Sequence, residues 1–188
     1  MSRQQIMTAA IQHLNENPTA SMAQLAEAAG ISRATLHRHF SSRDELMLAL
    51  GHQAHDRWEQ VQLSAGLEAA TASGDREVLV KAMNALLAGL IEVADEYGFG
   101  LTDDILAVHP ELMRRVDELE ERELAFYAAA QRAGLLSPGL PTIWVGHVMY
   151  GLLVAVRNGL RRGDIARREV PRLLLDTFLY GVAPRRES

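Results

Sequence analysis

Apolar residues recur every three to four positions along most of this chain. No stretch alternates with a period of two for long enough, between turn signals, to predict a β-strand. Only 5% of the residues are aromatic. The pattern therefore predicts an all-α protein, and 188 residues suffice for a small helical domain joined to a larger one.

Caps and breakers divide the chain into predicted helices. A serine followed three residues later by Gln or Glu is a capping box, and Ser21 with Gln24 and Ser42 with Glu45 have this form. Ser32 is a further N-cap candidate, and glycines and prolines end several helices. The predicted helices span about 3–15, 21–30, 32–40, 42–62, 76–97, 110–133, 142–160 and 168–180, with a short helix after Thr102.

Residues 63–75 are small and polar, which is typical of a connection between two structural units. We therefore expect one domain at 1–62, including the connecting fourth helix, and a larger helical domain at 63–188. The absence of cysteine excludes a disulfide scaffold, a thiolate metal site and a cysteine nucleophile. The N-terminus does not have the pattern of a signal peptide, and the apolar stretch 143–156 is shorter than a membrane span. These features predict a cytoplasmic protein that inserts in no membrane and holds no cofactor.

The sequence gives little support to an enzyme. It contains no phosphate-binding loop, dinucleotide-binding loop, zinc-protease motif or nucleophile elbow. His52 and His55 lie one turn apart near Asp56, and this spacing leaves open a metal-dependent helical enzyme as an alternative.

The most informative segment is GISRATLHRHFSSR, residues 30–43. Two short helices joined by a tight turn that contains glycine have the form of a helix-turn-helix, whose second helix enters the DNA major groove. The segment holds three arginines, two histidines and no acidic residue, although the whole chain has a formal charge of −5. This local positive charge suits contact with phosphates. Helical spacing turns Leu36 and Phe40 inward and leaves outward Arg33, Ala34, His37 and Arg38.

Residues 5–50, with LAEAAGISRATLHRHFSSRDEL at their centre, resemble the TetR/AcrR family of bacterial transcription regulators. The matching features, in the family's order and spacing, are Ala29-Gly30-Ile31, the Ser32 cap, Thr35-Leu36, Phe40 and Asp44-Glu45-Leu46. The resemblance covers about the first quarter of the chain, and the helical remainder has the length and pattern of the family's regulatory domain. It implies a homodimer that binds a palindromic operator in double-stranded DNA and is released by an unknown small-molecule effector, more commonly as a repressor than as an activator.

The resemblance also implies DNA contacts. Base-edge contacts are implied for Arg33, Ala34 and Thr35. Phosphate contacts are implied for Ser21, Met22, His37, Arg38, His39 and Arg43. Position 37 departs from the family, which usually has tyrosine there, and a histidine contact is expected to strengthen at lower pH, where the imidazole is charged.

The last two predicted helices are too apolar for the surface of a monomer. Gly151, Ala155 and Gly159 recur every four residues, which fits either packing within the monomer or a close crossing with a second subunit. In the resembled family the last two long helices of each subunit form a four-helix dimer bundle. On that ground Leu174 and Phe178 join these three small residues as a predicted dimer interface.

A predicted effector pocket is lined mostly by apolar and aromatic side chains with a few polar anchors. The candidates are Met83, Leu87, Phe99, His109, Met113, Tyr127, Trp144, His147 and Tyr150. The same residue types at helical spacing also form ordinary cores. Residues 92–123 carry eleven carboxylates against three arginines, which fits a solvated face or attraction for a cationic ligand. The alternative to an inducible repressor is a DNA-binding dimer without an effector, which a fully packed second domain would favour.

Overall fold

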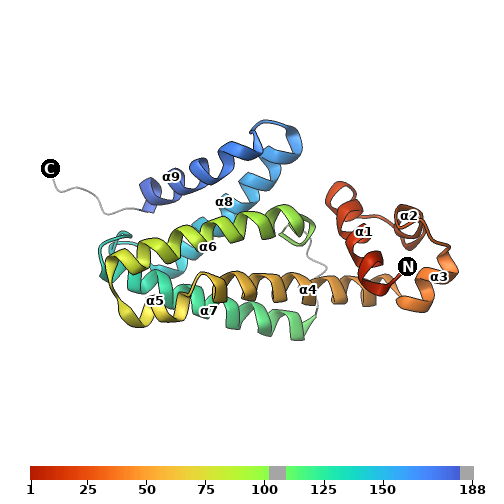
Figure 1. Ribbon diagram of the computed structural model, residues 1–188, viewed down its shortest axis with the longest axis horizontal. Coiled ribbons are helices and arrows are strands. Elements are labelled where there is room, and N and C mark those ends of the chain that lie inside the picture. Colours follow the sequence, from red (N-terminus) through yellow and green to blue (C-terminus); the bar gives the residue numbers. More distant parts are fainter. Residues whose placement is uncertain (102–108, 183–188) are drawn as a thin grey trace. The chain divides into compact units, whose positions relative to one another are not determined.

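The computed structural model describes residues 1–101 and 109–182, with side chains in the last helix described as far as Leu179. Within these ranges every regular element is a helix, which confirms the predicted all-α class. The short helix expected after Thr102 lies outside the described residues. The elements are α1 (Arg3–Glu16), α2 (Met22–Ala28), α3 (Arg33–His39), α4 (Arg43–Ser64), α5 (Leu67–Ser73), α6 (Arg76–Glu96), the 3-10 helix η1 (Gly98–Leu101), α7 (Pro110–Arg132), α8 (Thr142–Arg162), the 3-10 helix η3 (Arg167–Glu169) and α9 (Val170–Val182) (Figure 1).

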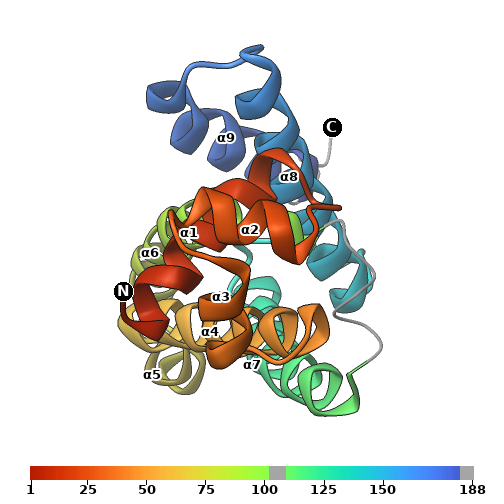
Figure 2. The same ribbon diagram turned by 90° about the vertical axis from the view of Figure 1, so that its right-hand side faces the viewer.

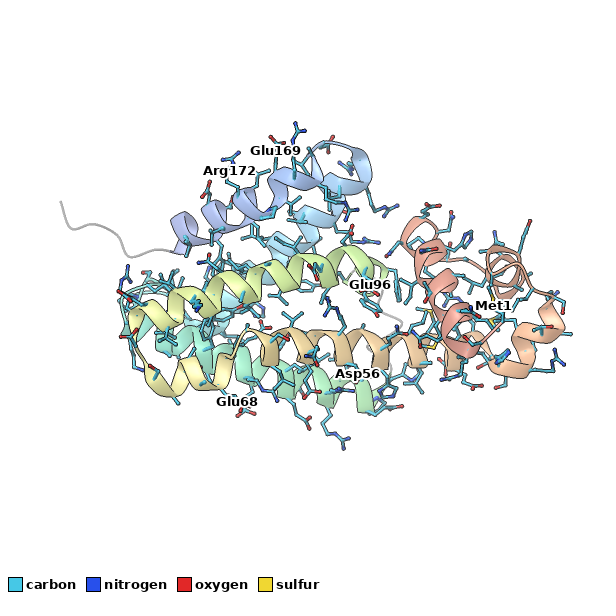
Figure 3. All side chains as sticks on the ribbon, in the orientation of Figure 1. Met1, Asp56, Glu68, Glu96, Glu169 and Arg172 are labelled. Atoms are coloured by element: carbon cyan, nitrogen blue, oxygen red, sulfur yellow. The ribbon has the colours of Figure 1, made fainter. Side chains whose placement is uncertain are left out.

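The chain forms two compact units. The first contains Met1–Asp56 and Glu96–Arg115, and the second contains Arg57–Asp95 and Val116–Ser188. The chain therefore passes from one unit to the other three times, within α4, near the end of α6 and within α7. Asp56 and Glu96, labelled in Figure 3, mark two of these passages.

Helices α1, α2 and α3 enclose one apolar core in the first unit (Figure 2). Its central side chains are at most 1% exposed: Ile6, Leu14, Leu25, Leu36 and Phe40. Two predicted caps are present. Ser21 and Gln24 form the capping box of α2, and the Ser32 hydroxyl accepts the Thr35 N–H at 3.1 Å to begin α3.

The capping box predicted at the start of α4 forms only in part. Ser42 Oγ accepts the Glu45 N–H at 3.0 Å. The Glu45 carboxylate, however, accepts the N–H and the hydroxyl of Ser41, each at 2.7 Å. The return bond is displaced by one residue because Ser41 offers two donors, and these bonds hold the pKa of Glu45 below its usual value.

Part of the predicted connection at 63–75 is helical. Helix α5 lies between Gly66 and Gly74, both in the left-handed conformation. Leu67 and Ala70 are each 1% exposed, so burial of one face stabilises this short helix. This helix was not among the predicted ones, because the glycines, serines and threonine of the segment received more weight than its apolar pair.

The second unit has an aromatic core. The ring centroid of Tyr127 lies 5.9 Å from that of Phe126 and 6.0 Å from that of Phe178, and all three residues are fully buried. Because Phe178 belongs to α9, these contacts join the last helix to α7. Helices α8 and α9 pack side by side (Figure 1).

Among the described residues, one helix is long and apolar enough to cross a membrane. This helix is α8, of which 28% of the most apolar stretch is buried within the chain. Length and composition alone do not separate a membrane helix from a helix that packs against a protein partner.

Candidate functional site

The outward face of α3 is polar and accessible. Arg33, Ala34, His37 and Arg38 are exposed, whereas Leu36 is completely buried. This division agrees with the face predicted from helical spacing. Two short helices with a cationic outward face thus form a helix-turn-helix.

A left-handed glycine makes the turn between α2 and α3. Gly30 has φ of 65°, which a side chain would strain, and its N–H donates to the Glu27 carbonyl at 2.9 Å. The next N–H, of Ile31, donates to the Ala26 carbonyl at 3.0 Å. These bonds end α2 and redirect the chain so that Ser32 can cap α3.

Hydrogen bonds within α3 fix several of its polar side chains. The Thr35 hydroxyl lies 3.0 Å from Ser32 Oγ and accepts a hydrogen bond from Arg38 Nη2 at 3.2 Å. His37 Nδ1 lies 3.3 Å from the Ser41 carbonyl. Because a carbonyl only accepts, this bond requires the proton on Nδ1 and leaves Nε2 of a neutral ring without one.

Arg43 holds the loop before α2. Its Nε donates to the Ala20 carbonyl at 3.1 Å and its Nη2 to the Pro18 carbonyl at 2.8 Å. The side chain is half-buried, so much of its donor capacity serves the first unit itself. Ser21, which follows Ala20 in the chain, is exposed, and Met22 is half-buried.

Residues 6–50, which contain this helix-turn-helix, match the family model of bacterial regulatory proteins of the tetR family. The first quarter of the chain is thus similar to the tetR family of bacterial regulatory proteins. TetR-family proteins bind DNA and regulate transcription, typically as repressors.

Two curated relatives extend the likeness beyond the matched segment. The HTH-type transcriptional repressor LfrR of Mycolicibacterium smegmatis is 25% identical over 182 residues, which are 96% of this chain and 90% of LfrR. The HTH-type transcriptional regulator NfxB of Pseudomonas aeruginosa is 27% identical over 168 residues, 89% of this chain and 87% of NfxB. Both relatives are regulators of transcription.

Solved TetR-type structures share the fold over nearly the whole chain. LfrR from Mycobacterium smegmatis in complex with proflavine has a TM-score of 0.70 at 22% identity and covers 98% of each chain. The ketosteroid transcriptional regulator KstR2 of Mycobacterium tuberculosis has a TM-score of 0.71 at 16% identity, covering 97% of this chain and 95% of KstR2. The likeness in fold to these structures therefore includes the second unit of this chain.

The nine side chains predicted to line a pocket are divided between the two units. Phe99, His109 and Met113 belong to the first unit and the other six to the second. Met83, Leu87, Phe99 and Tyr127 are buried, whereas Met113, Trp144, His147 and Tyr150 are exposed. His109 Nε2 lies 3.2 Å from Asp44 Oδ1, so it pairs with the first turn of α4.

A buried carboxylate that the sequence analysis did not single out lies at the centre of the second unit. Glu123 is 8% exposed. Its Oε1 accepts Trp58 Nε1–H at 2.5 Å and Gln62 Nε2–H at 3.0 Å, and its Oε2 accepts the Tyr127 hydroxyl at 3.1 Å. Burial raises the pKa of Glu123 despite these three bonds. The helical position of Glu123, four residues before Tyr127, was the signal available in the sequence.

Arg122 connects this buried cluster to the surface. Its Nη1 donates to Gln62 Oε1 at 2.8 Å, and its Nε lies 3.3 Å from Glu68 Oε1 on α5. The guanidinium thus neutralises acidic groups at the surface, and none of the ion pairs among the described residues reaches Glu123.

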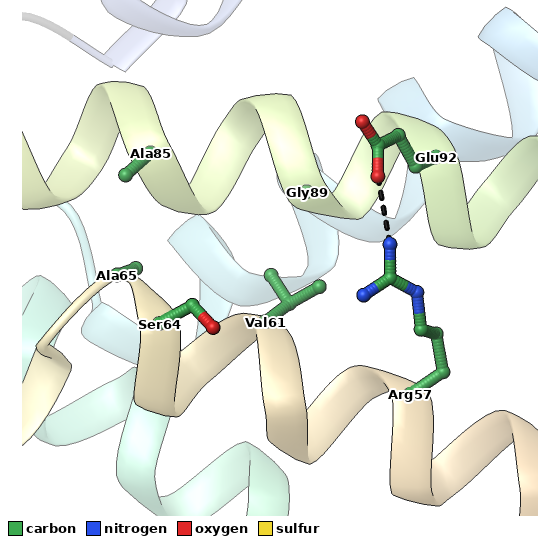
Figure 4. A pocket seen from close by; sticks show the side chains of 7 residues that line it. All are labelled: Arg57, Val61, Ser64, Ala65, Ala85, Gly89 and Glu92. Atoms are coloured by element: carbon green, nitrogen blue, oxygen red, sulfur yellow. Dashed lines mark hydrogen bonds and ion pairs between the residues drawn. The ribbon is translucent and has the colours of Figure 1, made fainter.

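A small open groove lies between α4 and α6 in the second unit (Figure 4). Its volume is about 160 Å³, and an ion pair from Arg57 Nη2 to Glu92 Oε2 at 2.7 Å crosses one end. Small side chains form the rest of the lining, with Val61 against Gly89.

The predicted interface residues occupy different environments. Gly151 and Ala155 are exposed on α8, and a Cβ on Gly151 would meet no atom within 4 Å. Gly159 packs against Ile165 of the same chain, and Leu174 and Phe178 are buried within the second unit. Gly151 and Ala155 are thus the two accessible members of the predicted set.

The histidines considered as metal ligands differ from each other in burial. His52 is half-buried, whereas His55 is 7% exposed and burial lowers its pKa to about 4. Among the described residues, no group of three His, Asp or Glu side chains has the arrangement of a metal site.

Proposed function

We propose that this chain is a dimeric repressor that binds a palindromic operator and leaves it when a small-molecule effector binds. The outward face of α3, with Arg33, Ala34, His37 and Arg38 exposed inside the matched TetR segment, carries the proposal. A recognition helix reads bases mainly from its N-terminal residues. Such a regulator acts in the bacterial cytoplasm, on the nucleoid.

In this proposal residues 1–62 bind DNA, and residues 63–188 bind the effector and form the dimer. Arg33 donates a bidentate pair to guanine, and Ala34 and the Thr35 methyl contact a thymine methyl. The phosphate contacts come from Ser21, Met22, His37, Arg38, His39 and Arg43. Arg43 has fewer free donors for a phosphate than its long side chain suggests, because its guanidinium already donates to two backbone carbonyls.

Selection of bound sequences from a random DNA pool tests the DNA-binding part. We expect the wild-type protein to recover a two-fold symmetric site. Arg33→Ala is expected to lose about 1–3 kcal/mol of binding free energy on that site and to relax one base position. Arg132→Ala, at an exposed arginine of the second unit, is the matched control and should select the wild-type site. Unchanged selection by Arg33→Ala would show that another element reads the bases.

The dimer proposal rests on the exposed face of α8. Ile143, Trp144 and Tyr150 are 48%, 54% and 53% exposed, and Gly151 and Ala155 lie on the same helix. No Asp, Glu, Lys or Arg occurs from Thr142 to Val156. A charge-free apolar face of this kind usually marks a protein interface. We commit to a second copy of this chain as its partner, with two-fold symmetry that matches a palindromic operator.

The effector proposal rests on Glu123. A carboxylate taken out of water without a cationic partner is costly, and three neutral donors offset this cost only in part. Two of its donors, Trp58 and Tyr127, are aromatic, and aromatic rings attract cations through their faces. We infer that the effector is a flat organic cation whose charge balances Glu123. Proflavine, found with the LfrR structure, belongs to this chemical class.

A proflavine titration tests this effector class. We expect the dye to release the wild-type protein from its selected operator and to act at least tenfold more weakly on Glu123→Gln, since a tenfold change corresponds to about 1.4 kcal/mol. Glu121→Gln, at an exposed position on the same helix, is the control. Equal release of Glu123→Gln would exclude Glu123 as the anchor, and no release of the wild type would exclude this class of effector.

One observation favours the alternative of a DNA-binding dimer without an effector. The α4–α6 groove holds about 160 Å³, less than the roughly 300–1,000 Å³ of typical ligand pockets. If no compound in a chemically diverse library changes operator affinity, the alternative replaces the effector part of the proposal. The DNA-binding and dimer parts do not depend on that result.

A further inference from the structure

The two oxygens of the buried Glu123 carboxyl group have different kinds of partner. Oε1 accepts Trp58 Nε1–H at 2.5 Å and Gln62 Nε2–H at 3.0 Å. An indole nitrogen only donates. The Gln62 amide is fixed as a donor, because its Oε1 accepts Arg122 Nη1–H at 2.8 Å and its Nε2 also donates to the Leu119 carbonyl at 2.9 Å. Two donors thus occupy Oε1 of Glu123, which carries no hydrogen of its own.

The other oxygen of Glu123 faces a group that can either donate or accept. Oε2 lies 3.1 Å from the Tyr127 hydroxyl, and a phenol hydroxyl has both a hydrogen and lone pairs. A neutral carboxyl group with its hydrogen on Oε2 therefore satisfies all three contacts: Oε1 accepts twice, as a carbonyl does, and Oε2–H donates to Tyr127. An ionised carboxylate has about four lone-pair sites for the same three neutral partners, and its charge is buried.

The charged groups near Glu123 do not favour its ionised form. Burial raises the pKa of Glu123, and the negative charge of Glu120, one turn earlier on α7, adds to this rise. The arginine next to it in sequence, Arg122, pairs with Glu59 at 3.7 Å and with Glu68 at 3.3 Å. From α4 the contacts to Glu123 come from neutral N–H donors. In the described part of the chain, the surroundings of this carboxyl group thus suit a neutral acid.

We propose that Glu123 keeps a proton on Oε2 in the ligand-free protein and loses it when a cationic effector binds. The inference rests on the proposed function, because it describes how the site assigned to the effector responds to charge. On binding, the Oε2–H bond breaks, the carboxylate keeps the electron pair, and the proton passes to the solvent. The buried site is neutral before binding, as an acid, and neutral after it, as an ion pair, so no charge is left buried without a partner.

Proton release makes this site sensitive to pH and selective for charge. The complex holds one proton fewer than the free protein, so affinity for a cation rises with pH as long as the free protein holds that proton. The rise reaches at most about tenfold per pH unit, and affinity becomes constant once Glu123 is ionised without ligand. A neutral ligand of the same shape releases no proton.

The first test needs no ligand. The infrared spectrum of the wild-type protein minus that of Glu123→Gln isolates this carboxyl group. At pH of about 6 an ordinary glutamate is almost fully ionised, so a protonated carboxyl band that remains there belongs to a shifted group. We expect this band for Glu123, and we expect no such band when the exposed Glu121→Gln is subtracted instead.

Glu123→Gln is expected to fold, because glutamine has nearly the same volume and repeats the bonding of the neutral acid. Its oxygen accepts the two N–H donors, and its amide hydrogen donates to Tyr127. Melting temperature shows whether it is folded. Carboxyl-carbon NMR of the wild-type protein gives the same information without any variant, since one glutamate should titrate at higher pH than the others.

The second test is calorimetry with an N-methylated proflavine, whose positive charge does not depend on pH. Titrations in buffers of different ionisation enthalpy count the protons released. At pH of about 6 we expect wild type and Glu121→Gln to release about 0.5–1 proton per ligand, and their affinity to rise at least about threefold from pH of about 5 to about 6. Glu123→Gln should release fewer than about 0.2 proton and show the same affinity at both values.

An ionised Glu123 in the ligand-free wild type at pH of about 6 would overturn the proposal, even if the cation binds and releases the protein from its operator. A protonated Glu123 that keeps its proton in the complex would overturn it as well. If the N-methylated proflavine does not bind the wild type, the cationic effector of the proposed function fails together with the release step. The infrared band and the NMR titration then still decide whether Glu123 keeps a proton.

Discussion

His37 has a single donor when its ring is neutral, and the Ser41 carbonyl uses it. The outward Nε2 then has only a lone pair, which a phosphate oxygen repels. Protonation adds an Nε2–H and a positive charge, both of which favour phosphate. Tyrosine, which the resembled family usually has at this position, has a hydroxyl that donates without taking up a proton.

If His37 makes the proposed phosphate contact, we predict that operator affinity is higher in mildly acidic than in mildly basic buffer, because a charged imidazole binds phosphate more strongly than a neutral one. Fluorescence anisotropy at constant ionic strength measures it. His37→Tyr should show a smaller rise and keeps His39, so the difference between the two curves isolates residue 37. Parallel curves for the two proteins would contradict the prediction.

Glu123 makes the stability of the chain pH-dependent in the opposite sense from a salt-bridged acid. Burial raises its pKa in the folded state, so the folded protein binds more protons than the unfolded chain in the interval between the two pKa values. Stability is therefore lost as pH rises through that interval. We predict that wild-type melting temperature falls relative to Glu123→Gln from pH of about 5 upward, because an ordinary glutamate titrates near pH 4.3. Calorimetry measures the difference, and a constant offset between the two proteins across this range would contradict it.

Rules that apply over a few neighbouring positions predicted some caps and buried residues correctly. They did not predict hydrogen bonds between residues that are far apart in the sequence. The Ser21 and Ser32 caps and the burial of Leu36 follow from spacing over three or four positions. The two carbonyls that bind Arg43 lie 23 and 25 positions away, and the partners of Glu123 lie on α4 as well as α7. Such contacts depend on how helices meet in space, which a single sequence does not specify.

At the scale of elements, α4 packs against α6 at a glycine. An added Cβ on Gly89 would lie 2.5 Å from Val61 Cγ1, well inside van der Waals contact. Val61 is β-branched and buried, so it has few alternative rotamers with which to move away. Gly89 therefore sets the spacing of the two helices that form the groove in Figure 4.

We predict that Gly89→Ala lowers the free energy of unfolding by about 1–3 kcal/mol, the usual cost of overpacking. Chemical denaturation measures this loss. The double variant Val61→Ala with Gly89→Ala should recover most of it, because the shorter side chain makes room for the new methyl group. A rescue that fails would show that the strain arises elsewhere.

The ends of helices were predictable where a capping or helix-breaking residue marks them. They were less predictable where burial of side chains determines whether a helix forms. The main helices of the second half follow their predicted ranges to within a few residues. Helix α5 was missed because its stability comes from Leu67 and Ala70 packing into the second unit. The hydrogen bonds of Asn15 to the Glu96 carbonyl and the Phe99 N–H were not predictable, since nothing in the local sequence links residue 15 to residues 96 and 99.

At the scale of the whole molecule, the formal charge of −5 conceals an uneven distribution. The segment 30–43 contributes three arginines and no acid, whereas residues 117–123 of α7 contribute five carboxylates and one arginine. This uneven distribution supports the proposal that the segment 30–43 is the part of the chain that approaches DNA. The sequence alone predicted this polarity, because it depends on the order of charges and not on tertiary contacts.

The apolar face of α8 leads to the last prediction. Trp144→Glu places a charge at the centre of the proposed interface, where burial without a partner is costly, so we expect a dimer to become a monomer in sedimentation velocity. Leu63→Glu is the matched control, because Leu63 is 56% exposed on α4 and lies outside that face. The control should remain a dimer and keep wild-type affinity for the symmetric operator, whereas Trp144→Glu should lose most of that affinity and keep its helical content. A monomeric wild-type protein, or a dimeric Trp144→Glu, would mean that another surface or no surface joins two copies, and a two-fold operator would then need a different explanation.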